Sequence, residues 1–270
     1  MTLLFMVIWL LEVAGVFYLY SPLPWGWWIP LTLISLPLTF AFNIFFFGGI
    51  IHLYGKTFKE ADWHNQKAQK AVVTYMKTIV FLLRYKLYFS GLENIPTDRA
   101  FILVGNHQTN YDTIIHKMKL PLNTIFIAKK AIFDWPIIGP IATAAGNIPM
   151  LRENDREAIK ALKKGIQAYQ EGMNVGIYPE GTRSKGNHLI EFKSGAFNLP
   201  MKPKAPILMA TVHDSIKTWK GWPFKRPHVS IHYHPIIEPS FYEKMTTKEL
   251  SEYVKKEISQ QLESFKSRVK

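Results

Sequence analysis

The sequence contains no cysteine among its 270 residues. This absence excludes a disulfide-stapled scaffold, a thiolate nucleophile and a cysteine-bound metal site. The first 55 residues also lack Lys and Arg, and Glu12 is their only acidic residue. Because apolar residues make up 48% of the chain, an intrinsically disordered protein is excluded as well. The length suits one or two domains with a sizeable core.

Charge is distributed very unevenly along the chain. The formal net charge is +13, and residues 56–270 hold all 33 Lys and Arg against 19 of the 20 acids, a net of +14. Two apolar runs, residues 3–20 and 27–51, fill the uncharged part. At ~1.5 Å per helical residue, each run reaches close to or beyond the ~30 Å hydrocarbon core of a bilayer. We therefore expect a membrane-associated helical hairpin at residues 1–55 and a second domain at residues 56–270.

Other interpretations of the apolar hairpin are weaker. A cleaved signal peptide needs a basic amino-terminal region, which is missing. A buried hairpin of a soluble core does not need two long runs that are apolar on all sides. The positive-inside rule then places residues 56–270 on the cytoplasmic side of the cell membrane, whether the hairpin spans the bilayer or enters one leaflet. Pro37 predicts a kink in the second helix, and Gly48 with Gly49 predicts a break or a close packing point.

A lysine-rich segment follows the hairpin at residues 58–85. Its apolar residues, among them Ala68, Val72 and Tyr75, recur at helical spacing. One interpretation is a core helix with a solvated basic face. The other is a helix that lies on anionic lipid headgroups. The pattern fits both, and we leave both open.

The rest of the chain alternates predicted strands and helices. Short apolar segments predict strands at residues 86–89, 100–104, 124–128, 148–151, 175–178, 207–212 and 229–236. Amphipathic spacing predicts helices at residues 154–171 and 247–269. Asn154 and Glu157 resemble a capping box at the start of the first of these helices, and Gly172 ends it. This order predicts an α/β fold with a mixed, mostly parallel sheet flanked by helices.

The first segment whose side chains could take part in catalysis is NHQTNYD, residues 106–112, directly after a predicted strand. On one continuous helix His107 and Asp112 would differ by ~140° in azimuth and would not meet. They can meet if His107 lies on the turn and Asp112 in the first turn of the next helix, capped by Thr109 or Asn110. Asp112 would then orient His107 as a general base. The pattern alone is short enough to be a loop histidine near an unrelated aspartate.

A second segment, YPEGTRS at residues 178–184, follows another predicted strand. Arg183 suits bidentate binding of a phosphate. Lys129 and Arg152 also end predicted strands, and ligands of α/β proteins bind at the carboxyl ends of strands. These cations form one electropositive pocket, or they are solvated surface residues of a basic chain.

Taken in order, NHQTNYD, AKKAIFDWPIIG, GNIPMLR and YPEGTRS resemble the glycerolipid acyltransferase family, in particular its PlsC-type 1-acylglycerol-3-phosphate acyltransferases. The resemblance covers residues 90–212. It implies transfer of a fatty acyl group from acyl-CoA or acyl carrier protein to the sn-2 hydroxyl of lysophosphatidic acid, which makes phosphatidic acid without a cofactor. It also implies that His107 is the general base and Asp112 its partner.

The resemblance assigns further residues by their place in these motifs. Arg152, Arg183 and Lys129 are implied to bind the substrate phosphate. The residues implied to shape the motif loops are Asn106, Glu180, Gly181 and Thr182. The family commonly has Ser where this chain has Thr109, which keeps the hydroxyl. A later family motif with two prolines is only half kept at residues 205–210, so no role is assigned there.

Several rival functions have weaker support. A serine hydrolase would carry a Gly-x-Ser-x-Gly turn, which is missing. The histidines His228, His232 and His234 share one strand face, but they have no clear carboxylate partner, so we expect exposed strand residues and no metal site. The bilayer, rather than nucleic acid, is the simpler target for the positive charge. Acceptors such as glycerol-3-phosphate, another lysophospholipid or an ornithine lipid stay open, as does a non-catalytic lipid-binding protein.

Overall fold

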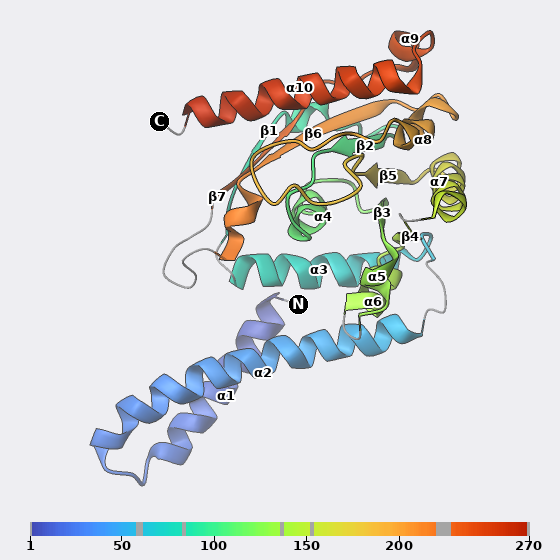
Figure 1. Ribbon diagram of the computed structural model, residues 1–270. Coiled ribbons are helices and arrows are strands. Elements are labelled where there is room, and N and C mark those ends of the chain that lie inside the picture. Colours follow the sequence, from blue (N-terminus) through green and yellow to red (C-terminus); the bar gives the residue numbers. More distant parts are fainter. Residues whose placement is uncertain are drawn as a thin grey trace.

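The amino-terminal helices form a hairpin that projects from the rest of the molecule (Figure 1). The computed structural model describes residues 2–57, 62–82, 85–135, 138–151, 154–219 and 228–268. Helix α1 covers Thr2–Tyr20 and α2 covers Trp28–Lys56, with a short 3-10 helix, η1, at Trp25–Trp27 between them. Helix α2 continues through Pro37. The division of the chain at residue 55 stays a prediction.

Polar side chains join the two helices of the hairpin. The amide of Asn43, which is fully buried, donates to the carboxylate of Glu12, the only acid of this segment. One turn away, Trp9 Nε1 donates to Thr39 Oγ1 at 3.1 Å. Such bonds hold apolar helices together where no water competes for the polar groups.

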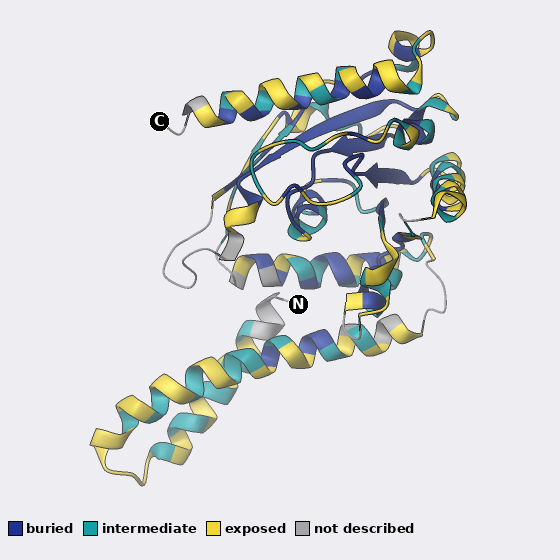
Figure 2. Cartoon of the chain, in the orientation of Figure 1, coloured by how far each residue is buried: buried dark blue, intermediate teal, exposed yellow. Residues whose placement is uncertain are grey.

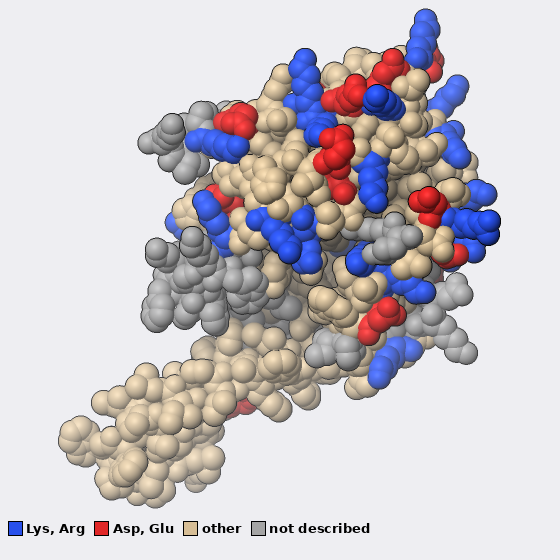
Figure 3. Space-filling model, viewed as in Figure 1, with Lys and Arg blue, Asp and Glu red and all other residues tan. Residues whose placement is uncertain are grey.

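Much of the outer surface of the hairpin is exposed (Figure 2), and its exposed large side chains are apolar. Its exposed large side chains include Leu10, Leu11, Leu33, Ile34, Leu38, Phe42 and Phe45. Residues Trp25–Ile50 are long and apolar enough to cross a membrane by length and composition, and Met6–Tyr20 form a shorter apolar helix. Residues 1–55 carry no Lys or Arg, and the Lys and Arg side chains gather over the α/β part (Figure 3). A soluble core hairpin would hide these side chains, so this arrangement favours a membrane-associated hairpin over a buried one.

Seven strands form one mixed sheet in the order β1-β7-β6-β2-β5-β3-β4. They are β1 Lys86–Ser90, β2 Ile102–Gly105, β3 Thr124–Lys129, β4 Ile148–Met150, β5 Asn174–Ile177, β6 Ile207–His213 and β7 His228–Tyr233. Every neighbouring pair is parallel except β6 and β7. The predicted fold class is therefore confirmed. Strands β2, β3, β4, β5 and β6 place their carboxyl ends at one edge of the sheet.

Helices cover both faces of this sheet (Figure 1). On one face lie α7 Asp155–Gln170, α8 Asn198–Met201 and α10 Thr247–Arg268; on the other lie α3 Gln66–Leu82, α4 Tyr111–His116 and α6 Ile138–Ala144. The short elements are η2 Leu92–Asn94, α5 Lys130–Phe133, η3 Ser194–Phe197, η4 Ser215–Trp219 and α9 Pro239–Tyr242. Because side chains alternate along a strand, Ile102 packs toward α7 and α10 while Leu103 packs toward α4.

A third apolar cluster fastens the hairpin to the α/β part. Phe47 of α2, Val72 and Tyr75 of α3 and Ile141 of α6 are buried together. A Cβ atom at Gly48 would lie 2.6 Å from the Tyr75 hydroxyl oxygen, so this glycine is a close packing point rather than a break. The lysines of α3 are exposed opposite its buried residues, which agrees with both interpretations of the basic helix.

Both ends of helix α7 agree with the sequence prediction. At the start, Asn154 Oδ1 accepts a hydrogen bond from the Glu157 N–H at 3.2 Å, and after the last turn Gly172 has φ +87°.

The expectation of exposed strand histidines is wrong for His234. This side chain is buried, and its Nε2 lies 2.8 Å from Thr211 Oγ1. Burial lowers the pKa of His234 to about 4, so the ring is neutral at physiological pH.

Candidate active site

Asn106 joins the loop after β2 to the neighbouring strand β6 by hydrogen bonds. Its Nδ2 donates to the Val212 carbonyl at 2.9 Å, and its Oδ1 accepts from the Val212 N–H at 2.7 Å. The side chain is fully buried and completes one rung of the sheet where the backbone of β2 has already turned away. Asn106 therefore fixes the starting point of the loop that carries His107.

His107 and Asp112 lie in contact at the carboxyl end of β2. His107 Nδ1 is 2.9 Å from Asp112 Oδ2, with His107 on the loop and Asp112 in the first turn of α4. The same oxygen of Asp112 accepts the N–H groups of Gln108 at 2.7 Å and Thr109 at 2.9 Å. One carboxylate therefore both holds the imidazole and folds the loop. With Nδ1 engaged, Nε2 is the ring nitrogen that can accept a proton from a ligand.

The start of α4 differs in detail from the predicted cap. Asn110 makes no side-chain capping bond, whereas Thr109 Oγ1 accepts the N–H of Tyr111 at 3.2 Å. The Thr109 hydroxyl also donates to Asp112 Oδ1 at 3.0 Å. The hydroxyl of Thr109 is thus shared between the helix start and the buried carboxylate.

The electrostatics of the pair favour an ionised Asp112. Complete burial raises the pKa of this carboxyl, but the hydrogen bond and the charge of His107, together with Ser215 and the Thr109 N–H, outweigh the burial and hold the pKa below its usual range. The ring of His107 stacks on Tyr178, with ring centres 4.2 Å apart and planes 6° apart. Asp112 and Tyr178 together restrict rotation of the imidazole.

Glu180 connects the loop after β5 to the same histidine. Its Oε1 accepts the His107 N–H at 2.8 Å, and the Ser184 N–H donates to the His107 carbonyl at 2.8 Å. The backbone of His107 is therefore held from both sides by residues of the YPEGTRS segment. Glu180 is only 3% exposed, and burial raises the pKa of its carboxyl to about 7.

The variant Glu180→Gln tests this buried carboxyl. The folded pKa of about 7 lies above the ordinary 4.5, so the unfolded chain releases this proton first as the pH rises. The stability due to Glu180 is thus fully present below pH 4.5 and is lost as the pH rises through about 7, by up to ~3 kcal/mol. Glutamine keeps an oxygen for the His107 N–H without the charge. Urea unfolding of Glu180→Gln between pH 5 and 8 should show a smaller loss of stability than wild type.

A matched control for this experiment is the exposed Glu243, changed to glutamine in the same way. This variant should keep the wild-type dependence of stability on pH. An unchanged pH dependence in Glu180→Gln would show that the buried carboxyl is not the group that titrates.

The predicted phosphate ligands lie around this edge of the sheet. Arg183 and Thr182 are exposed on the loop after β5, and Lys129 is exposed at the end of the adjacent strand β3. Gly181 has φ +66°, a conformation that glycine adopts at little cost. Arg152 lies outside the described residues. The exposed guanidinium of Arg183 can be reached by an anion from solution.

Gln108 and Tyr178 lie near the His107–Asp112 pair, but the sequence motifs give neither residue a role. Gln108 Nε2 donates to Val212 O at 3.0 Å and to Asn187 Oδ1 at 2.9 Å, and its Oε1 accepts the Ser215 N–H and hydroxyl at 3.0 and 3.1 Å. It fastens the histidine loop to the end of β6. Tyr178 supports the imidazole ring. In the sequence, only their position inside the segments NHQTNYD and YPEGTRS indicates that Gln108 and Tyr178 belong to the site.

An apolar cavity of about 230 Å³ lies beside this loop, between α3, α4 and α6. Asn110 and Tyr111 line it next to the histidine loop, and Val72, Met76, Ile114, Ile132, Trp135, Ile138 and Ile141 supply most of its apolar wall. In the part of the chain that the structure describes, no group of three His, Asp or Glu side chains could hold a metal ion. The site therefore offers a histidine–aspartate pair, exposed cations and an apolar slot.

Comparisons with known proteins agree with this arrangement. Residues 86–212 match the Acyltransferase family model. A 1-acyl-sn-glycerol-3-phosphate acyltransferase of Borreliella burgdorferi is 28% identical over 71% of this chain and 77% of its own length. A chloroplastic protein of the same name from Arabidopsis thaliana is 36% identical over 56% of this chain, but the match spans only 42% of its length.

A solved structure supports the fold. The crystal structure of the 1-acyl-sn-glycerophosphate acyltransferase PlsC from Thermotoga maritima aligns with a TM-score of 0.65 and 23% identity, over 95% of each chain. The aligned region includes both the hairpin and the α/β part, because so little of either chain is left out. At this identity the likeness establishes the fold that the two proteins share.

Proposed function

Residues 86–212 of this chain form a domain of the acyltransferase family, and we propose that the protein transfers a fatty acyl group from a thioester to the sn-2 hydroxyl of 1-acylglycerol-3-phosphate. The product is phosphatidic acid. The observation that carries the proposal is the buried His107–Asp112 pair at the sheet edge. The names of the similar proteins supply the substrate class.

In the proposed reaction His107 acts as the general base. Its Nε2 takes the proton of the acceptor hydroxyl while the oxygen attacks the thioester carbonyl. The tetrahedral intermediate collapses, the C–S bond breaks, and the departing thiolate takes the proton back from the imidazolium. Asp112, ionised and buried, stabilises that imidazolium. A chain without cysteine is compatible with this direct displacement, in which no acyl-enzyme forms and no cofactor is needed.

Arg183 and Lys129 are proposed to bind the phosphate of the acceptor, with Arg152 as a third ligand. Arg183 lies on the loop that follows β5, and Lys129 ends the adjacent strand β3, so both cations lie on loops at the same edge of the sheet. Glu180, Gly181, Thr182 and Asn106 hold the two loops in position. A guanidinium and an ammonium from different strands would fix the orientation of the acceptor relative to His107.

The acceptor and the acyl chain are proposed to come from the bilayer. The apolar cavity beside Tyr111 opens among α3, α4 and α6, and α6 packs on the hairpin helix α2. A fatty chain can therefore pass from the lipid phase to the site without crossing water. The uncharged hairpin and the cationic remainder support a location at the cell membrane, with the catalytic part on the cytoplasmic side.

The decisive experiment is an acyl-transfer assay with the purified full chain in mixed micelles. Lysophosphatidic acid is offered with acyl-CoA and, separately, with acyl carrier protein, and phosphatidic acid is measured. Glycerol-3-phosphate, other lysophospholipids and ornithine lipids serve as alternative acceptors in parallel. Phosphatidic acid is the expected product. Failure to acylate any acceptor with either donor would overturn the proposed function.

Replacement of Arg183 by alanine tests the phosphate site. Hydrogen bonds to charged groups contribute ~1.5–3 kcal/mol, so we expect KM for lysophosphatidic acid to rise ~10- to 150-fold. Monoacylglycerol, which lacks the phosphate, should be acylated by the variant as well as by wild type. The control is Arg156→Ala, which removes an exposed arginine of α7. Equal losses with both acceptors would argue that Arg183 does not bind phosphate.

A further inference from the structure

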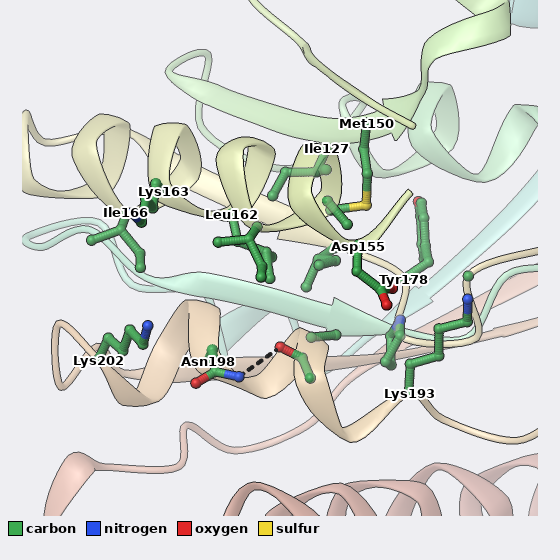
Figure 4. Close-up of a pocket in the computed structure, with 17 residues that line it drawn as sticks. Ile127, Met150, Asp155, Leu162, Lys163, Ile166, Tyr178, Lys193, Asn198 and Lys202 are labelled. Atoms are coloured by element: carbon green, nitrogen blue, oxygen red, sulfur yellow. Dashed lines mark hydrogen bonds between the residues drawn. The ribbon is translucent and has the colours of Figure 1, made fainter. Parts of the chain in front are cut away.

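A second and larger cavity lies on the opposite face of the sheet from the apolar cavity beside Tyr111. Its volume is about 500 Å³, and it lies between α7 on one side and the η3–α8 segment on the other (Figure 4). One end reaches Tyr178, Pro179 and Gly181, where β5 passes into the loop that holds His107. This cavity is called the α7 groove below.

The α7 groove combines an apolar floor with a basic rim. The floor is formed by Ile127, Met150, Ala158, Leu162, Ile166 and Ile177. Three lysines, Lys163, Lys193 and Lys202, also line it, against the single carboxylate of Asp155. All three lysines are exposed. The groove thus suits an elongated ligand that is apolar along its length and negatively charged.

The lysines are separated along the groove. Lys163 and Lys202 lie at the end near Ile166, whereas Lys193 lies at the other end with Tyr178 (Figure 4). Helix α7 runs along the groove from Asp155 to Ile166, which corresponds to ~16 Å at 1.5 Å per residue. Between the two ends, the Asn198 side chain lines the groove as a polar group, and its amide donates to the Gly195 carbonyl at 3.0 Å.

We propose that the α7 groove holds the 4′-phosphopantetheine arm of the thioester donor, with its phosphate between Lys163 and Lys202. This inference rests on the proposed function. The arm is elongated, carries two amides and apolar carbons, and ends in a phosphate at one end and the thioester sulfur at the other. Acyl-CoA and acyl carrier protein share it, so one groove serves both donors.

This placement of the phosphopantetheine arm also brings the thioester close to His107. With the phosphate at Lys163 and Lys202, the sulfur lies at the Tyr178 end, and the Tyr178 ring stacks on His107. The acyl chain then continues over the strand ends toward the apolar cavity beside Tyr111. That cavity has no exposed cation among its described lining residues, since Lys117 is buried. The donor would therefore span both faces of the sheet.

The test uses the double variant Lys163→Gln/Lys202→Gln of the full chain. Its substrates are palmitoyl-CoA, palmitoyl-acyl carrier protein, palmitoyl-4′-phosphopantetheine and palmitoyl-pantetheine, which lacks the phosphate. We expect donor KM to rise about five- to twentyfold for the three phosphorylated donors and to stay unchanged for palmitoyl-pantetheine, because exposed charge pairs contribute modestly. The matched control is Lys164→Gln, a neighbouring exposed lysine of α7 that does not line the groove.

A second variant tests the groove by filling it. A Cβ atom at Gly195 meets nothing within 4 Å, so Gly195→Phe adds a ring to the lining without a backbone clash. This variant should slow transfer from all four donors, and palmitoyl and octanoyl donors should be affected equally, because the acyl chain lies elsewhere. A change confined to chain-length preference would show that the groove holds the chain, and would overturn the proposal.

Direct binding separates this inference from the proposed function. Binding of palmitoyl-4′-phosphopantetheine is measured without acceptor, and the double variant should bind it about five- to twentyfold more weakly than wild type. If wild type binds the donor in this way but acylates no acceptor, the proposed function fails and the groove assignment stands. Equal binding by wild type and the double variant, or an increase in KM for lysophosphatidic acid instead, would overturn the groove assignment.

Discussion

Replacement of His107 by alanine is expected to lower kcat by ~10²–10⁴-fold, the contribution of a positioned general base. The acceptor hydroxyl would then have to lose its proton to water. Alanine keeps the backbone N–H that donates to Glu180 and the carbonyl that accepts from Ser184, so the loop should stay in place. The measurement is the steady-state formation of phosphatidic acid, with unfolding temperature recorded in parallel.

The control for His107→Ala is Tyr178→Phe. Phenylalanine keeps the ring that stacks on the imidazole and removes only the hydroxyl, which lies 3.5 Å from Thr113 Oγ1. This variant should retain most of the wild-type rate. If His107→Ala turned over lysophosphatidic acid at the wild-type rate, the general-base mechanism would be wrong, whatever the fold of the variant.

The variant Asp112→Asn should lower kcat about as much as His107→Ala, although it leaves the histidine in place. In a Ser–His–Asp hydrolase the equivalent change lowers kcat by ~10⁴-fold, because the amide leaves the imidazole in the wrong tautomer, and we expect a loss of that order. Asp112 also accepts the N–H groups of Gln108 and Thr109. An amide nitrogen directed at those donors would cost a further ~1–3 kcal/mol of stability. Unlike His107→Ala, this variant should therefore lose both activity and stability.

The dependence of stability on pH gives a second readout for Asp112. Its folded pKa lies below the ordinary 3.8, so its contribution is present above pH 3.8 and is lost as the pH falls through the lower folded value. Asp112→Asn should lack this acid-dependent component. A variant that kept full activity and the wild-type loss of stability in acid would contradict the role of the buried carboxylate.

The strands could be predicted because their signals are local. Short apolar runs between turns located all seven strands to within a few residues. Spacing alone allowed His107 and Asp112 to meet across a strand, a turn and the first turn of a helix, and the family resemblance made their contact the expected arrangement. These relations depend on neighbours in the chain, which periodicity and spacing describe well.

The remaining features depend on partners far away in the sequence. Asn106 and Gln108 are held by Val212 and Ser215, more than 100 residues later, and no spacing rule indicates such pairs. The sequence pattern predicts an exposed His234, because strand periodicity identifies a face but not what covers it. The pocket beside His234 is lined by Tyr253 and Glu257 of α10, so that helix covers this face.

The packing of α2 against α6 has a consequence for how substrate is encountered. Phe47, Val72 and Ile141 join the hairpin to the α/β part in one buried cluster, which fixes the position of the α/β part relative to the hairpin. Under the proposed function, an enzyme that the hairpin anchors in the bilayer would search for its acceptor in two dimensions. Its rate would then follow the mole fraction of lysophospholipid in the surface, and dilution with inert lipid would slow the reaction even at an unchanged bulk substrate concentration.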